Sequence, residues 1–275
     1  MGVKTAMTIL NSTPAHRPPA VAGMFYPGPA SELERSVELY LQQAPVEPLS
    51  KRPKAMIVPH AGYIYSAPVA ARAFKQLEPF ADEISQVILL GPSHRVPFTG
   101  IASSSAEAFD TPLGAIPLNR NTIDRVNQLP FVVPYDEAHQ QEHSLEVQLP
   151  FLQKVLSDFT LVPLVIGQAS DEQVGQLIEY LWDDPGTLFL ISSDLSHYLD
   201  YDTARQYDFA TMKAIEQLEP QKIQYEQACG RTGIAGLLLA AKNHHLKVKT
   251  LDIRNSGDTA GSKDQVVGYG SWVFV

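Results

Sequence analysis

Three apolar runs of the sequence each end in side chains that can bind a metal ion or transfer a proton. These side chains are His60 after Ala55–Val58, His94 after Gln86–Leu90, and Asp194 and His197 after Thr187–Ser192. Imidazole suits iron, copper and zinc, and two histidines with one anionic ligand are typical of open non-heme iron sites. One such histidine alone could merely hydrogen-bond the backbone where a strand meets a loop. Three together favour a common site.

The single cysteine is a candidate anionic ligand. Cys229 stands before Gly230 and Arg231, just ahead of an apolar run that we expect to be helical. A helix N-terminus and a nearby arginine lower the pKa of a thiol, so we expect a thiolate that acts as a ligand or a nucleophile. A small buried core residue is the other common role of a free cysteine, and the spacing does not decide between the two.

A fourth cluster, residues 136–146, is dense in carboxylates and histidines and leads into an expected helix. An acidic first turn that complements the helix dipole would account for Glu142. His143 has no such explanation, so we expect it to lie beside the metal ligands or to face a substrate. The remaining histidines in polar stretches, His16, His244 and His245, are expected on the solvated surface.

The elements that carry these residues alternate between buried strands and helices. This alternation predicts an α/β fold with a central, largely parallel but mixed sheet covered by helices on both faces. Ligands bind outside the carboxyl ends of strands in such sheets, where the three histidine-bearing runs end. The other strands expected are Leu161–Ile166, Phe98–Ser103, Ala115–Leu118, Lys247–Ile253 and Gln265–Val275, the last two as closing strands. The helical segments expected are Ser31–Leu41, Ala67–Leu77, Ser144–Leu156, Asp171–Trp182 (capped by Ser170), Thr203–Leu218 and Thr232–Lys242.

Length and charge narrow the class of protein. The chain has 275 residues, 21 Lys and Arg, 30 Asp and Glu, one Cys and a formal net charge of -9. No linker is visible, so we expect a single domain over residues 1–275, with residues 1–16 as a flexible N-terminal tail. One cysteine excludes an intramolecular disulfide and multi-cysteine metal frameworks. The acidic balance argues against binding to nucleic acids or anionic membranes, which requires clustered Lys and Arg.

Several function classes lose support because their motifs are missing. The sequence has no run of ~20 apolar residues and no signal-peptide core, so we expect a cytoplasmic protein. It also lacks the glycine-rich loops of nucleotide-binding proteins, the H-E-x-x-H of zinc peptidases and the G-x-S-x-G of serine hydrolases.

Five ordered motifs resemble those of a known family. They are Pro59-His60-Ala61-Gly62-Tyr63, Gly91-Pro92-Ser93-His94, Glu142-His143-Ser144-Leu145-Glu146, Ser192-Ser193-Asp194-Leu195-Ser196-His197 and Cys229-Gly230-Arg231. With the N-terminal segment Arg17–Pro27, they make the chain resemble the MEMO family, whose prokaryotic members are called AmmeMemoRadiSam system protein B. The resemblance covers nearly the whole chain.

The resemblance implies a role for each of these residues. The MEMO family is similar in fold to the class III extradiol (LigB-type) dioxygenases, which hold Fe(II) with two histidines and a glutamate and cleave catecholic rings. By this resemblance, the metal ligands would be His60, His94 and Cys229, with the cysteine replacing the carboxylate. The catalytic residues would be His197, as acid or base, and Asp194, which would ligate the metal or orient His197. Residues around the ligands or against a substrate would be Tyr63, Glu142, His143 and Arg231.

The cysteine leaves the activity open. A thiolate is softer than a carboxylate, which favours copper while Fe(II) and zinc remain acceptable. A metal-bound thiolate is also oxidisable by O₂, which conflicts with repeated dioxygenase turnover. The sequence therefore fits a metal-dependent redox or dioxygenase-like enzyme acting on a small molecule. It also fits a metal-handling or peptide-binding module that kept the fold, or a pocket that binds no metal. The resemblance adds an AMMECR1-type protein and a radical-SAM protein as expected partners.

Overall fold

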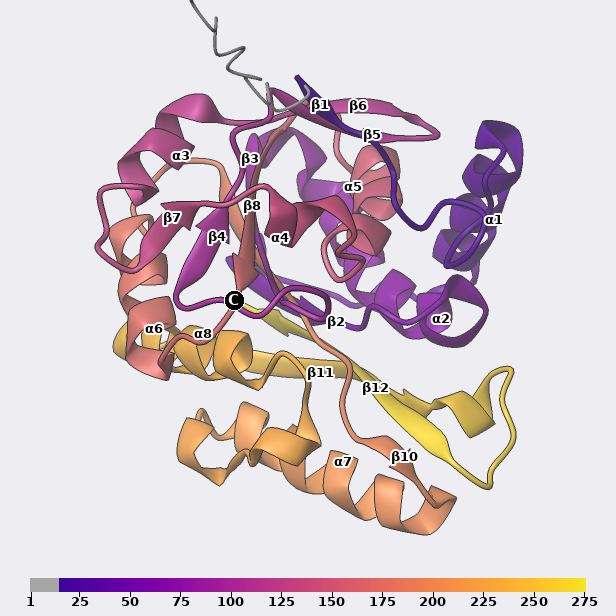
Figure 1. Ribbon diagram of the computed structural model, residues 1–275. Helices are drawn as coiled ribbons and strands as arrows, with labels where there is room; N and C mark the ends of the chain where they lie inside the picture. The colour runs from indigo at the N-terminus through magenta and orange to yellow at the C-terminus, as the bar shows by residue number, and fades with distance from the viewer. Residues whose placement is uncertain (1–14) are drawn as a thin grey trace, which may run out of the picture.

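A nine-stranded mixed sheet forms the centre of the computed structural model, which describes residues 15–275 (Figure 1). The strand order is β10-β12-β2-β9-β3-β8-β4-β7, and β11 pairs with β12 beside this path. The central strands β2, β9, β3 and β8 are parallel, whereas β12 and β4 pair antiparallel with β2 and β8. The bounds are β2 Ala55–Val58, β3 Gln86–Pro92, β4 Ile101–Ser103, β7 Val132–Pro134, β8 Thr160–Ile166, β9 Thr187–Ser192, β10 His197–Leu199, β11 Val248–Asn255 and β12 Val266–Phe274.

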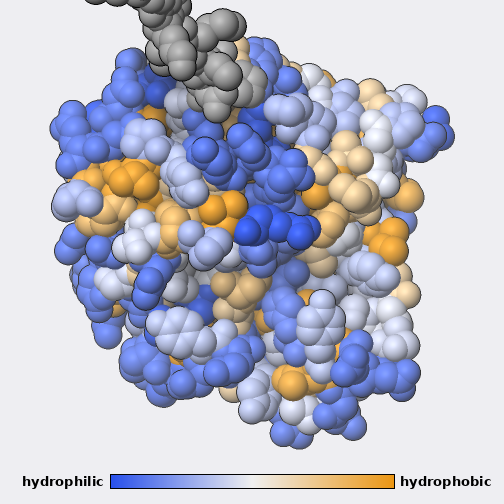
Figure 2. All heavy atoms as spheres, in the orientation of Figure 1, coloured by the Kyte–Doolittle hydropathy of each residue, from blue (hydrophilic) through white to orange (hydrophobic). Residues whose placement is uncertain are grey.

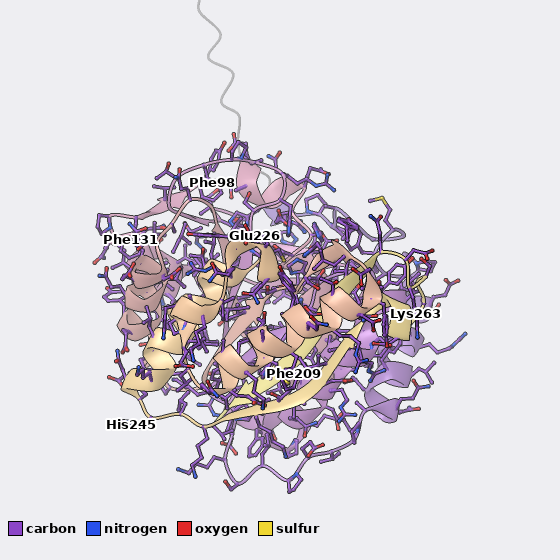
Figure 3. All side chains as sticks on the ribbon, turned by 90° about the horizontal axis from the view of Figure 1, so that it is seen from below. Phe98, Phe131, Phe209, Glu226, His245 and Lys263 are labelled. Atoms are coloured by element: carbon purple, nitrogen blue, oxygen red, sulfur yellow. The ribbon has the colours of Figure 1, made fainter. Side chains whose placement is uncertain are left out.

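Helices cover both faces of this sheet, which confirms the predicted α/β class. On one face α2 (Tyr63–Phe74) packs on β2 and β12, and α1 (Ala30–Gln43) and α5 (Leu149–Val155) pack beside it. On the other face lie α6 (Asp171–Tyr180), α7 (Tyr201–Glu216) and α8 (Arg231–Asn243) (Figure 1). Seen from below, α7 crosses the near side of the molecule and carries Phe209 (Figure 3).

The smaller elements connect or flank these layers. A second sheet of three strands has the order β1-β5-β6. Its strands are β1 His16–Arg17, β5 Ala108–Thr111 and β6 Gly114–Pro117. The short helices are α3 Arg120–Val126, α4 Glu137–Gln140 and the 3₁₀ turns η1 Lys75–Glu83, η2 Glu146–Gln148, η3 Pro220–Lys222, η4 Tyr225–Gln227 and η5 Ser256–Asp258.

Burial explains why the central strands are continuous apolar runs. Every residue of β2 and β9 is buried, as is all of β3 except Pro92 and all of β8 except Thr160. Strands with helices on both faces have no solvent side on which polar residues could alternate. The face seen in Figure 2 is largely hydrophilic, with apolar residues in separate patches. No helix within residues 15–275 is long and apolar enough to cross a membrane.

Most of the expected N-terminal tail, residues 1–14, lies outside the described residues. Its last two residues belong to the folded domain. The Ala15 carbonyl accepts a hydrogen bond from the backbone N–H of Glu107, and His16 begins β1, with its Nδ1 2.9 Å from Asp110 Oδ1. His16 is exposed, as are His244 and His245, in agreement with the prediction.

Two helix starts differ from the prediction by about a turn, whereas those of α1, α7 and α8 differ by only one or two residues. α2 begins at Tyr63, one turn before the expected Ala67. The helix expected from Ser144 begins later, with a 3₁₀ turn at Glu146 and regular α-helix only from Leu149. The reason for the second difference is local, because the backbone N–H of Ser144 donates to the Glu142 carboxylate and holds this segment in a loop.

A buried ion pair attaches the N-terminal segment to this loop. Arg17 Nη1 lies 2.6 Å from Glu146 Oε2, and both side chains are almost fully shielded from solvent. The same carboxylate accepts hydrogen bonds from the backbone N–H groups of Ala20 and Val21 and from the hydroxyl of Tyr26. These additional bonds offset the large desolvation cost of burying the two charges.

Removing this carboxylate is expected to be costly. Glu146→Ala leaves the Arg17 guanidinium buried without a counter-charge, so we expect the free energy of unfolding to fall by about 3–5 kcal/mol. Urea unfolding followed by circular dichroism measures this loss. The matched control is Glu78→Ala, which breaks an exposed pair with Lys75 and should cost at most about 0.5 kcal/mol. Equal losses in the two variants would contradict the expectation.

Candidate metal centre

The sheet order brings the three predicted strand ends together. β2, β9 and β3 are adjacent and parallel, so the residues that follow them meet at one edge of the sheet. One ligand atom from each of His60, His94 and Cys229 lies within 4.8 Å of the other two. These three residues could therefore hold one metal ion.

Hydrogen bonds fix the tautomer of His60. The hydroxyl of Ser192 donates its only hydrogen to the Ser144 carbonyl at 2.5 Å and accepts from Gln148 Nε2 at 2.9 Å. Its 2.9 Å contact with His60 Nδ1 must then be a donation by the ring N–H. The lone pair is left on Nε2, which lies 3.3 Å from Cys229 Sγ. Burial and the neighbouring histidines lower the pKa of His60, which keeps the ring neutral as a metal ligand must be.

Glu142 fixes the tautomer of His94 in the same way. Glu142 Oε1 lies 2.9 Å from His94 Nδ1, and Oε2 accepts the backbone N–H of His94 at 2.6 Å. Although burial opposes it, hydrogen bonding and the charge of His94 lower the pKa of Glu142 to about 2. An ionised carboxylate only accepts, so Nδ1 carries a hydrogen, and in the neutral ring that binds a metal the lone pair is then on Nε2. Such carboxylate–histidine pairs orient metal ligands in many proteins.

Cys229 reaches the histidines because the start of α8 packs tightly against the end of β9. A Cβ at Gly230 would stand 2.7 Å from the Ser192 carbonyl oxygen, so only glycine allows this approach. The thiol accepts the backbone N–H of Asp194 at 3.3 Å, and the Cys229 N–H donates to the Asp194 carbonyl at 3.2 Å. The sulfur position is thus held from both sides.

The expectation of a low thiol pKa is wrong. Burial, followed by the charge of Asp194, raises the pKa of Cys229 to about 12. Arg231 does not counter this, because its guanidinium pairs with Asp171 at 2.6 Å and its Nε donates to the Ile223 carbonyl. Metal ions deprotonate a coordinating thiol, so a cation between the ligands would supply the missing positive charge.

Asp194 positions two of the three ligand candidates. Its Oδ1 accepts the backbone N–H of His60 at 2.7 Å, while its backbone brackets Cys229 as described above. Burial raises the pKa of Asp194 to about 7, against the lowering effect of the His60 N–H. The carboxyl group therefore lies at the site and can change protonation near neutral pH.

The His143 ring lies directly beside the rings of the candidate ligands His60 and His94. Its ring centroid is 4.6 Å from that of His94 and 5.5 Å from that of His60, and it packs on Phe25. Burial lowers the pKa of His143 to about 4, and its Nδ1 lies 3.3 Å from Glu142 Oε1 but makes no hydrogen bond within residues 15–275. His143 could also form a metal-binding group with His94 and Glu142. Four N–H groups already occupy the Glu142 oxygens, however, so Glu142 orients rather than ligates.

The other predicted site residues, His197, Tyr63 and Arg231, belong to neither group of possible metal ligands. His197 begins β10, and burial lowers its pKa, with the charge of His94 acting in the same direction. Tyr63 is buried in the core, where its hydroxyl donates to the Val147 carbonyl at 2.8 Å. Arg231 points to Asp171, as described above. Sequence reasoning missed Ser192, although it stands in a quoted motif, because its role depends on contacts with residues 44 and 48 positions away.

A cavity of about 540 Å³ opens beside Cys229. The ends of β3 and β8, the loop that carries Phe98 and the first turn of α8 line it. None of the lining side chains that the structure describes is charged. Burying an unpaired charge is costly, so this cavity suits an uncharged ligand.

Comparison with known proteins agrees with these motifs. The family model described as "Memo-like protein" matches residues 17–273. The chain belongs to the Memo-like family. This confirms the resemblance stated from the sequence. The matched residues include nearly all of both sheets and all three candidate ligands.

Curated relatives match this chain over nearly the full length of both proteins. A "MEMO1 family protein" of Aquifex aeolicus is 35% identical over 270 residues, which cover 94% of this chain and 99% of the relative. Those of Thermotoga maritima and Metallosphaera sedula are each 34% identical and cover 92% of this chain and 97% of the relative. Among solved structures, an uncharacterized protein of Escherichia coli K12, JW3007, matches with a TM-score of 0.55 at 13% identity, covering 79% of this chain and 99% of that one. That likeness shows the fold alone.

Loss of the Glu142 carboxylate is expected to loosen the site. In Glu142→Gln, the amide N–H₂ faces the N–H groups that now donate to the carboxylate, so the His94 ring is no longer held by a hydrogen bond from its Nδ1. We expect Co²⁺ affinity to fall about 10- to 100-fold, the usual cost of losing a residue that orients a metal ligand. Competition with a chromogenic chelator measures the affinity. Glu137→Gln, an exposed substitution on the same segment, is the matched control and should bind Co²⁺ like the wild type. Equal affinities in all three proteins would show that Glu142 does not act through His94.

Proposed function

We propose that this protein is a metal-dependent redox enzyme, dioxygenase-like in its site, that acts on a small uncharged molecule. His60, His94 and Cys229 hold one ion, Fe(II) or copper by preference and zinc as the third option. The observation that carries the proposal is the pair of oriented histidines: His60 turns its Nε2 lone pair toward the thiol at 3.3 Å, and Glu142 holds Nδ1 of His94, which has a ligand atom within 4.8 Å of the other two. A hydrogen-bonded pocket without a metal would not need both rings in this one tautomer.

In this proposal, different side chains bind the metal, transfer protons and bind the substrate. Three protein ligands leave coordination positions open, and a bound iron or copper ion supplies redox chemistry there. His143, whose Nδ1 makes no hydrogen bond within the described residues, and His197 are the groups that move protons, and both rings have pKa values below the usual range because they are buried. Asp194 holds the His60 backbone, and the cavity beside Cys229 receives the substrate. The relation to the LigB-type dioxygenases is part of this proposal.

Cys229 favours a second function, that of a metal-handling or peptide-binding module. A thiolate ligand prefers Cu(I) to Fe(II), and O₂ would oxidise it during turnover. The thiol lies at the cavity wall, where a diffusing molecule can reach it. An AMMECR1-type protein and a radical-SAM protein as partners, and a cytoplasmic location, remain proposals that rest on the family resemblance and the composition.

Metal uptake and O₂ consumption separate the two functions. The protein is reconstituted without oxygen with Fe(II) or with Cu(I), desalted, and analysed for retained metal and for O₂ uptake with catechol-like substrates. We expect one ion per chain in the wild type. We expect Cys229→Ser to lose Cu(I) affinity by more than the ~100-fold typical of residues that only orient a ligand.

The controls define what each result means. His60→Ala should lose both metals, whereas His16→Ala, an exposed histidine, should lose neither. O₂ uptake no greater than that of His60→Ala would eliminate the oxygenase and leave the metal-handling function. Unchanged Cu(I) affinity in Cys229→Ser would show that the thiol is not a ligand. No metal retained by the wild type would contradict the enzyme and the metal-handling function and leave only a peptide-binding module.

A further inference from the structure

The segment that joins β9 to β10, residues 193–196, has no regular secondary structure, although the candidate metal centre depends on it. Asp194 Oδ1 accepts the backbone N–H of His60 at 2.7 Å, and the Asp194 N–H donates to the Cys229 sulfur at 3.3 Å. His197 follows the segment directly as the first residue of β10. The position of this segment therefore affects two candidate ligands and one candidate acid or base.

Two neighbouring elements hold the middle of the segment. From β12, the Gly268 carbonyl accepts the Leu195 N–H and the Gly268 N–H donates to the Ser196 carbonyl, both at 2.8 Å. From α7, which packs along β12 (Figure 3), Asp208 Oδ1 accepts the Ser196 N–H at 3.0 Å. No backbone carbonyl among the described residues accepts this N–H. A bulge at Tyr198 interrupts the pairing of β10 with β12 just beyond, so regular strand pairing does not fix the segment there.

The Asp208 carboxylate reaches Ser196 only because β12 has a glycine at the contact. A Cβ at Gly268 would stand 2.5 Å from Oδ1, the oxygen that accepts the Ser196 N–H, and closer still to Oδ2. Real Cβ atoms do not approach an oxygen so closely, so any larger residue would displace the carboxylate. Gly268 thus supplies both the backbone groups that pair with the segment and the space for the carboxylate.

The carboxylate carries a cost that a purely structural contact would not need. Asp208 is 2% exposed, and no Lys, Arg or His side chain within residues 15–275 pairs with it. Burial raises the pKa of Asp208 to about 6, against the lowering effect of Ser196. An amide would accept the same N–H without a buried charge, whereas an ionised acceptor makes a stronger hydrogen bond. The additional strength goes to the position of Ser196.

We propose that Asp208 is a positioning residue for the candidate metal centre, where its hydrogen bond to Ser196 fixes Asp194 and His197 and, through Asp194, the sulfur of Cys229. This inference rests on the proposed function, because the bound metal ion is what the positioning serves. Asp208 belongs to neither group of possible metal ligands and does not line the cavity beside Cys229. It therefore acts only through the segment.

Removing the acceptor tests the positioning role in folded protein. We expect Asp208→Ala to weaken Co²⁺ binding about 10-fold, the lower end of the cost of losing a group that orients a ligand. The thiolate-to-Co²⁺ absorption band of Cys229 should weaken with it. Asp208→Asn keeps an acceptor oxygen and should recover most of both losses. The matched control is Thr211→Ala, because Thr211 is buried on the same helix and its hydroxyl bonds only to the Tyr207 carbonyl within α7. This control should change urea stability but not Co²⁺ binding.

Gly268→Ala tests the same contact from β12 and keeps the carboxylate in the chain. The added Cβ should displace the carboxylate and weaken Co²⁺ binding about as much as Asp208→Ala. The double variant should bind Co²⁺ no more weakly than either single variant, because both substitutions break one contact. Losses that add in the double variant would overturn the inference, as would Asp208→Asn binding no better than Asp208→Ala.

NMR signals of the His60 and His197 imidazoles, recorded without metal, separate this inference from the proposed function. We expect these signals to shift in Asp208→Ala, to return toward wild type in Asp208→Asn, and to stay unchanged in Thr211→Ala. A wild type that takes up no Co²⁺ while the signals still shift in this way would contradict the proposed function and support the role of Asp208. Normal Co²⁺ binding with unshifted signals in Asp208→Ala, or equal effects in Thr211→Ala, would overturn the inference and leave the proposed function.

Discussion

The buried carboxylate of Glu142 is the group on which the geometry of the site depends. A charge taken out of water must be met by hydrogen bonds, and Glu142 accepts four of them from N–H groups. Two come from His94 and the others from the backbone of His143 and Ser144. Satisfying one buried charge therefore sets the direction of one candidate ligand and the position of a second imidazole.

The loop that carries Glu142 is in turn held by the N-terminal segment. Arg17 donates to the Glu142 carbonyl and pairs with Glu146, four residues further along. Gly91 at the end of β3 permits this packing, since a Cβ there would stand 2.8 Å from Ser144 Oγ. The motifs at the two ends of this contact are far apart in the chain, yet they form one hydrogen-bonded unit. Its stability and the geometry of the site are therefore coupled.

Apolar runs and a helix cap in the sequence predicted much of the fold, because burial of a strand and capping of a helix are determined by the residues within that element. The bounds of β2 and β9 coincide with the predicted runs, since strands buried on both faces must be apolar throughout. Ser170 caps α6 as expected, with Gln173 completing the capping box. The loop before α5 and the bulge at Tyr198 could not be predicted, because a carboxylate contact creates the first and pairing with β12 creates the second.

The sequence by itself determined the family and the α/β class and placed His60 and His94 at strand ends, since apolar runs and ordered motifs carry their meaning in order and spacing. Cys229 became the third candidate ligand only through the family resemblance. Only the tertiary structure decided the state of those ligands. The tautomers of both histidines depend on Ser192 and Glu142, which lie 132 and 48 positions away from their partners. The thiol pKa is high rather than low because burial beside Asp194 outweighs the helix terminus. Hydrogen bonding and desolvation depend on distance in space, which the order of residues does not contain.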